Sequence, residues 1–190
     1  MTLKRFARIV APFLAMALYP TALHAQTAKP VAKPAAKPVP SIGGAQPNLL
    51  GQYGDWGAYA ASPGGKKVCF VISRPTKTLP ANVRRDPSYL FISTRPAEKV
   101  TEEVSIILGY PAKSSADGAV EVGSDSIALY AQNDSAWVKN APDEAKLVTA
   151  LRGGAEAVVK AESQRGTKTT DTYSLKGVTQ ALDRAAQECK

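Results

Sequence analysis

Short apolar runs bounded by glycine, proline and polar residues dominate the chain from about Gly51 to Lys190. Runs of this length, with alternation of apolar and polar positions, are typical of half-buried strands. The pattern predicts strands over residues 52–59, 67–73, 89–94, 103–110, 119–122, 126–130, 155–162 and 169–175. Many short strands at this spacing favour a β-sandwich or a barrel.

Turn residues and tryptophans refine this pattern. Pro63-Gly64-Gly65 separates the first two predicted strands, and Gly123-Ser124-Asp125 separates residues 119–122 from 126–130. Both separations indicate β-hairpins. Trp56 and Trp137 are interpreted as core anchors, because buried tryptophans commonly fill sandwich cores.

Two helices interrupt the strand pattern. Residues 142–152 begin with a proline and two acids and end at Gly153-Gly154, which are helix start and stop signals. Residues 178–189 form the second helix, at the C-terminus. Its apolar stripe consists of Val178, Leu182, Ala185 and Cys189. The prediction is a mainly β fold with two short helices.

The N-terminus has the pattern of a Sec-type signal peptide. A basic start is followed by an apolar run from Ile9 to about Leu23 and by a small residue, Ala25. Cleavage after Ala25 would give a periplasmic or secreted protein. The alternative, a retained anchor, requires a longer apolar run without Pro12 and Pro20. No transmembrane segment is expected in the mature chain.

Residues 26–50 read as an Ala/Lys/Pro-rich linker, followed by one domain over residues 51–190. Ala-Lys-Pro occurs three times, and such a segment cannot bury enough apolar surface to fold. Its prolines favour an extended spacer of about 3.1 Å per residue. A mere solubilising tail is the alternative.

The formal net charge of +8 is unevenly placed. Six surplus positive charges precede Gly51, which leaves +2 for the domain. A nucleic-acid binder concentrates basic charge on its folded module, so nucleic acid is excluded as the main partner. The basic linker is expected to make weak contact with an anionic surface.

Cys69 and Cys189 are the two cysteines of the chain. In an exported chain, an oxidising compartment favours a disulfide between them, and two free buried thiols are the alternative. Closing a loop of this length contributes about 4–5 kcal/mol in the chain-entropy model. Cys189 lies on the apolar stripe of the second helix, where it would face the strand that carries Cys69.

Few catalytic groups remain in the predicted mature chain. His24 is the single histidine and leaves with the signal peptide, which excludes His-dependent nucleophilic mechanisms and His-ligated zinc. We therefore expect no enzyme activity, cofactor or metal. The alternative is a hydrolase that acts on glycans through carboxylates such as Glu98 and Asp171. Glu102 and Glu103 are adjacent on a strand and therefore point to opposite faces.

Two groups of charged residues are candidates for binding a partner. Arg165, Lys168 and Asp171 lie in a threonine-rich run that is interpreted either as a polar patch or as a solvated strand after a turn. Arg95 and Glu98 flank an X-Pro turn and are interpreted either as part of a binding surface or as a salt-bridged pair.

Several distinctive runs occur in one order along the chain: Tyr53-Gly-Asp-Trp56, Lys67-Val-Cys-Phe70, Asp86-Pro-Ser-Tyr-Leu-Phe-Ile92, Arg95-Pro-Ala-Glu98, Glu103-Val-Ser105, Gly109-Tyr-Pro111, Ala136-Trp137 and Arg165-Gly-Thr-Lys-Thr-Thr-Asp-Thr-Tyr-Ser-Leu-Lys-Gly177. This ordered set resembles the invasion-associated locus B family of exported alphaproteobacterial proteins. The resemblance implies an immunoglobulin-like β-sandwich. It also implies a virulence-associated role, because the namesake is associated with entry into host red cells. The expected partner is an envelope or host-surface protein or glycan.

Overall fold

The computed structural model describes residues 39–114 and 116–190. The predicted signal peptide and residues 26–38 of the predicted linker lie outside these residues. The first strand begins at Asn48, and segment 39–47 already packs on the sheet through Val39, Ile42 and Ala45. The folded part therefore extends further towards the N-terminus than residue 51.

The described part contains eleven strands in one antiparallel sheet. They are β1 (Asn48–Tyr53), β2 (Trp56–Ala61), β3 (Val68–Ser73), β4 (Lys77–Leu79), β5 (Tyr89–Arg95), β6 (Val100–Ile107), β7 (Gly118–Val122), β8 (Asp125–Gln132), β9 (Ser135–Val138), β10 (Glu156–Glu162) and β11 (Lys168–Ser174). Their order across the sheet is β1-β2-β3-β5-β6-β9-β8-β7-β10-β11-β4. Both edge strands are irregular or short, since β1 shifts register between Leu49 and Gly51 and β4 has three residues.

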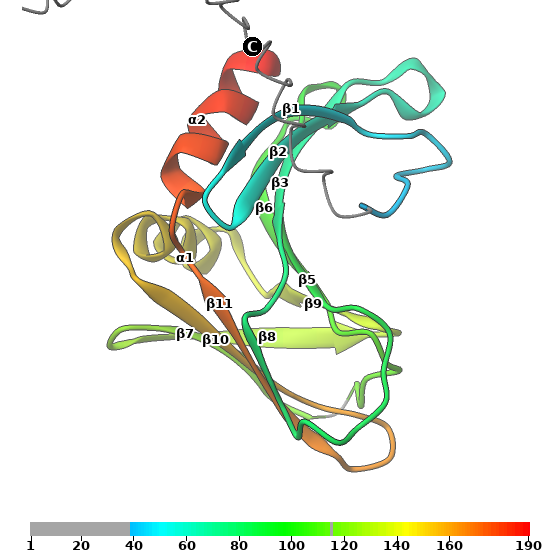
Figure 1. Cartoon of the computed structure of the whole chain (residues 1–190), viewed down its shortest axis with the longest axis vertical. Coiled ribbons are helices and arrows are strands. Elements are labelled where there is room, and N and C mark those ends of the chain that lie inside the picture. Colours follow the sequence, from blue (N-terminus) through cyan, green and yellow to red (C-terminus); the bar gives the residue numbers. More distant parts are fainter. Residues whose placement is uncertain (1–38, 115) are drawn as a thin grey trace, which may run out of the picture. The chain divides into compact units, whose positions relative to one another are not determined.

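The two halves of this strand order, β2, β3, β5 and β6 in one and β7, β8, β10 and β11 in the other, line one main core (Figure 1). Alternate residues of the strands point into it, such as Cys69 and Val71 on β3 and Ala157 and Val159 on β10. The arrangement is sandwich-like, with one continuous ladder in place of two separate sheets. The predicted mainly β fold with two helices, the second of them C-terminal, is confirmed.

Helix α1 (Ala141–Gly153) starts at Asn140, whose side chain accepts a hydrogen bond of 2.9 Å from the backbone N–H of Asp143. This is an N-cap, which satisfies a donor that the helix itself leaves free. Leu147 and Leu151 of α1 are buried in the main core. Helix α2 (Val178–Glu188) packs its predicted apolar stripe against β1, β2 and β3.

A disulfide joins Cys69 on β3 to Cys189, immediately after α2, with 5.9 Å between the two Cα atoms. The predicted pairing is confirmed. The bridge closes a loop over a sequence separation of 120 residues, so it connects the first half of the domain to its C-terminal helix.

The β1–β2 turn packs directly on the start of α2. The backbone N–H of Asp55 donates to the carbonyl oxygen of Lys176 over 3.1 Å. Gly177 has a φ of 95°, and a Cβ at this position would lie 2.0 Å from the carbonyl oxygen of Tyr53. Glycine is therefore required here both by the backbone conformation and by the close approach of another chain segment.

A second apolar cluster lies on the face of β2, β3 and β5 that is turned away from the main core. Its centre is aromatic: the rings of Tyr59 and Phe70 are 5.4 Å apart, and those of Phe70 and Phe91 are 5.5 Å apart. Segment 39–47 packs on this cluster. Strand β3 is therefore buried on both faces.

Candidate binding face of the sheet

The structure separates the three predicted patch residues Arg165, Lys168 and Asp171. Arg165 is exposed in the turn between β10 and β11, and Lys168 is exposed at the start of β11. Asp171 points to the opposite face of β11 and is 1% exposed. Asp171 therefore does not belong to a surface patch with the two basic residues.

Asp171 is the centre of a buried hydrogen-bond network. Arg85, from the loop between β4 and β5, donates from both Nη atoms to the carboxylate, with Nη1 at 2.9 Å from Oδ2. Ser88 Oγ donates to the same Oδ2 over 2.9 Å and lies 2.7 Å from the hydroxyl of Tyr173. These hydrogen bonds connect the loop between β4 and β5 with strand β11.

The pKa shifts in this network follow from burial and from the ion pair. Burial alone would lower the pKa of Arg85, but the hydrogen bond and the charge of Asp171 outweigh it, so the pKa is raised. For the Tyr173 hydroxyl, burial has the opposite effect and raises the pKa, because the charged form of tyrosine is the deprotonated one. Both groups therefore keep their protons at neutral pH.

The predicted acid pair of Glu98 and Asp171 does not form one site. Glu98, in the short helix η2 (Pro96–Glu98), pairs with Arg95 at 2.7 Å. Asp171 is buried against Arg85. A sugar that contacted Glu98 at the surface would not reach the carboxylate of Asp171.

Arg95 is the centre of a second cluster, at the end of β5. Its Nε donates to Glu98 over 2.7 Å, as the predicted ion pair requires, and its Nη1 donates to Glu103 and Ser93, each over 2.8 Å. The hydrogen bond to Glu103 is the main cause of the raised pKa of Arg95, and the bond to Glu98 adds to it against the effect of burial. Glu102 instead pairs with Arg152 of α1, at 2.7 Å. The two adjacent glutamates therefore bind cations on different elements, as their opposite orientations require.

A hollow of about 440 Å³, here called the Arg95 groove, lies on the outer face of the sheet, the face turned away from the main core. Its floor is formed by residues of β3, β5 and β6, and segment 39–47 and the β2–β3 connection form its sides. Its lining residues are Ile42, Gly43, Pro63, Lys66, Val68, Phe91, Ser93, Arg95, Glu98, Glu103 and Ser105.

One cross-strand row extends from the floor of this groove over four strands. Phe91 pairs with Ser105, Ser105 with Trp137, and Trp137 with Tyr130. Directly paired residues share a face of the sheet, so all four side chains lie on the outer face. The Trp137 and Tyr130 rings are 5.5 Å apart and 27° from parallel, and Tyr130 is 43% exposed.

The interpretation of Trp137 as a core anchor is wrong, while that of Trp56 is confirmed. Trp56 is fully buried and donates from Nε1 to the carbonyl oxygen of Ser174 over 2.9 Å. Trp137 is part-exposed on the outer face because Ala136 and Val138 occupy the inward positions of β9. That alternation, small residues inward and the ring outward, is the signal in the sequence that identifies this aromatic pair.

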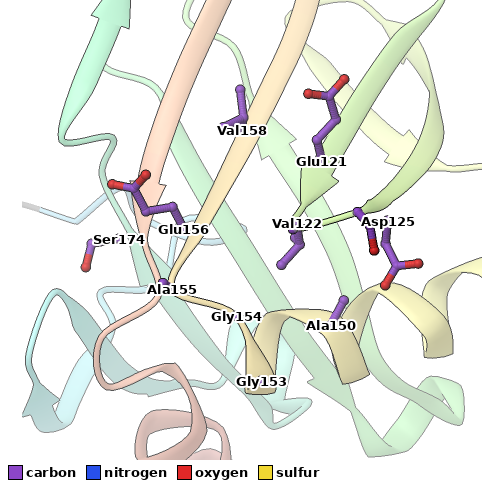
Figure 2. A pocket seen from close by; sticks show the side chains of 12 residues that line it. Glu121, Val122, Asp125, Ala150, Gly153, Gly154, Ala155, Glu156, Val158 and Ser174 are labelled. Carbon is purple, nitrogen blue, oxygen red and sulfur yellow. The ribbon is translucent and has the colours of Figure 1, made fainter.

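A second hollow of about 870 Å³ lies where the β7–β8 turn meets the end of α1 and the start of β10. Figure 2 shows that the carboxylates of Glu121, Asp125 and Glu156 point in different directions. Glu121 forms an ion pair with Lys160, with 2.8 Å between Oε1 and Nζ. Asp125 forms one with Lys146, with 3.0 Å between Oδ1 and Nζ. Since these carboxylates do not converge, the hollow lacks the facing acids on which glycoside hydrolysis depends.

The fold and the outer face define the class of this protein: a small, sandwich-like β domain whose C-terminal helix is bound to the sheet by one disulfide. The model of the Invasion associated locus B (IalB) protein family matches residues 56–186, from β2 into α2. The chain therefore belongs to this family, as its ordered sequence runs predicted. No curated protein and no solved structure matches the chain.

Proposed function

We propose that this chain is an exported, non-enzymatic interaction protein that holds an envelope or host-surface partner on the outer face of its sheet. The observation that carries the proposal is the Arg95 groove, which continues through Ser105 to the exposed pair of Trp137 and Tyr130. Arginine, tyrosine and tryptophan are the side chains most enriched at binding hot spots. The family name supports an invasion-associated role without specifying a mechanism.

The pairing of the carboxylates supports binding over catalysis. Glu103 and Glu98 share Arg95, and Asp171 is bound by Arg85. A general acid must be free to reach the atom that takes its proton, whereas each of these carboxylates is already engaged by an arginine. These acids are therefore better suited to fixing the shape of the site than to transferring protons.

Export is the second part of the proposal. The disulfide between Cys69 and Cys189 supports it, because such bonds persist mainly outside the reducing cytoplasm. Among the described residues, neither helix has the length and the apolar content that a membrane crossing requires. A periplasmic or secreted location agrees with the predicted signal peptide.

The proposal is tested by a pull-down in which the purified chain and two variants capture binding partners from envelope extract and from host-surface extract. Arg95→Ala removes the cation that organises the groove, and we expect it to lose the captured partner. Lys146→Ala is the matched control, because it removes one exposed ion pair on α1, away from the groove. Far-UV circular dichroism verifies that both variants are folded.

Three results would contradict the proposal. The first is capture that Arg95→Ala leaves unchanged, and the second is no capture from either extract. The third is release of sugars from envelope glycan by the wild-type chain, which would favour the hydrolase alternative.

A further inference from the structure

We infer that Tyr130 and Trp137 form a stacking platform for a neutral oligosaccharide, with the Arg95 groove as the adjoining polar subsite. The inference rests on the function proposed above and names the ligand class of the same face. A pyranose ring has a flat face of C–H bonds and an edge of hydroxyl groups. Such a ring is matched by an aromatic face beside hydrogen-bonding side chains.

The small apolar area around the pair favours a narrow ligand over a protein surface. On the outer face, its neighbours along β8 and β9 are Ser126, Ala128, Gln132 and Ser135, which are small or polar. The other large apolar side chains exposed in the described part, Leu79 and Val83, lie on β4 and in the loop after it. A stable protein interface requires a broader apolar centre than one ring pair provides.

The charges of the groove favour a ligand without charge. Two cations, Lys66 and Arg95, and two carboxylates, Glu98 and Glu103, line the groove, so their formal charges cancel. The guanidinium of Arg95 is already bound by both carboxylates and by Ser93. An anionic ligand would have to displace these partners and would be repelled by the displaced carboxylates. Sugar hydroxyls donate to the free carboxylate lone pairs and accept from Ser105 without breaking an ion pair.

The two tryptophans give the test a selective readout. Trp56 is fully buried, whereas Trp137 is part-exposed, so a neutral collisional quencher such as acrylamide reaches Trp137 preferentially. The probe is chitohexaose, a neutral, β-linked hexamer of N-acetylglucosamine, added to the purified full chain. We expect the bound hexamer to shield Trp137 and so to reduce quenching in a saturable manner.

Variants and calorimetric titration then locate the binding site. We expect Tyr130→Ala and Trp137→Ala each to weaken chitohexaose binding by about two- to tenfold, the range associated with one aromatic contact. Leu79→Ala is the matched control, because Leu79 is also 43% exposed but lies on β4, and this variant should bind like the wild type. Thermal unfolding verifies that each variant is folded.

Three results would overturn the inference: no shielding at millimolar chitohexaose, equal affinity in both aromatic variants and the wild type, or shielding by dextran sulfate in place of the neutral hexamer. If capture of a protein still depends on Arg95 while chitohexaose does not bind, the saccharide inference fails and the interaction role remains. If neither occurs, both fail.

Discussion

At the scale of single residues, Asp171 is a buried carboxylate whose contacts must compensate for lost hydration. It is 1% exposed, and hydrogen bonds from Arg85 and Ser88 replace those that water would make. Removing one partner of a buried ion pair leaves an uncompensated charge, whereas an exposed pair contributes little. The two ion pairs of Asp171 and Glu98 should therefore differ strongly in their effect on stability.

Asp171→Ala should lower the free energy of unfolding by about 3–5 kcal/mol, because the guanidinium of Arg85 then remains buried without a counterion. Glu98→Gln is the control and should change it by at most about 1 kcal/mol, since side-chain exposure of Glu98 is 49%. Urea unfolding measures both variants. Equal losses in the two variants would refute the structural role of the buried pair.

The contribution of Glu144 to stability changes with pH in the direction opposite to that of most carboxylates, whose pKa is lowered by folding. Burial raises its pKa, and the charge of Glu103 adds to this, although the backbone N–H of Val104 donates to Oε1 over 2.6 Å and opposes the shift. The folded state therefore binds this proton more tightly than the unfolded state does. Between the unfolded pKa and the higher folded pKa, stability falls as the pH rises.

Glu144→Gln should remove that loss, because an amide keeps the acceptor for Val104 without a charge. We expect the variant to gain stability relative to the wild type as the pH rises above the ordinary glutamate pKa of about 4.3. Urea unfolding at several pH values measures this difference, with the exposed Glu156→Gln as the control. A difference that shrinks with rising pH would contradict the assigned direction.

Between elements, the contact of the β1–β2 turn with the start of α2 leaves no space for a side chain. Gly177→Ala would place a methyl group against the carbonyl of Tyr53, in addition to the cost of a left-handed backbone. Gly166→Ala is the matched control, because its φ is 81° but nothing lies within 4 Å of the added Cβ. We expect about 1–2 kcal/mol of destabilisation at Gly166, from the backbone alone.

At Gly177, overpacking should add about 1–3 kcal/mol to that backbone cost. Thermal or urea unfolding compares the two alanine variants. Similar losses at both positions would show that the turn moves aside and that α2 does not depend on this close contact.

The elements that the sequence predicted are those with strong local signals. The hairpin turns at Gly64 and Gly123, the proline at the start of α1 and the apolar stripe of α2 each require only neighbouring residues. The pattern does not predict β4 and β9, which have only three and four residues. Strand β4 derives its pairing from β11, and β9 from β6 and β8. The predicted strand over residues 52–59 is in fact two strands, because Gly54, at a φ of 55°, makes a tight turn with Asp55 between Tyr53 and Trp56.

The candidate site was less predictable than the fold, because its partners are distant in sequence. The ion pair of Arg95 and Glu98 is local, and the sequence predicted it. Arg85 and Asp171 are 86 residues apart, and a charged residue on a strand is ordinarily expected to face water. The row that joins Phe91 to Trp137 depends on the registers of β5, β6 and β9, which no local pattern specifies.

For the molecule as a whole, segment 39–47 is part of the folded structure and covers the aromatic cluster of Tyr59, Phe70 and Phe91. A chain truncated to begin at Asn48 should expose these rings. We expect it to bind more of a hydrophobic dye such as anilinonaphthalene sulfonate and to unfold at lower temperature than the full chain. A chain that begins at residue 39 is the control, and equal dye binding by both would show that the segment does not cover the cluster.

The two edge strands are poor templates for pairing with another molecule. On one side, β4 has three residues, and on the other, the bulge at Leu50 interrupts the register of β1. An incoming strand would form few consecutive hydrogen bonds with either. Concentrated solutions of this protein should therefore resist the edge-to-edge aggregation to which open sheets are prone.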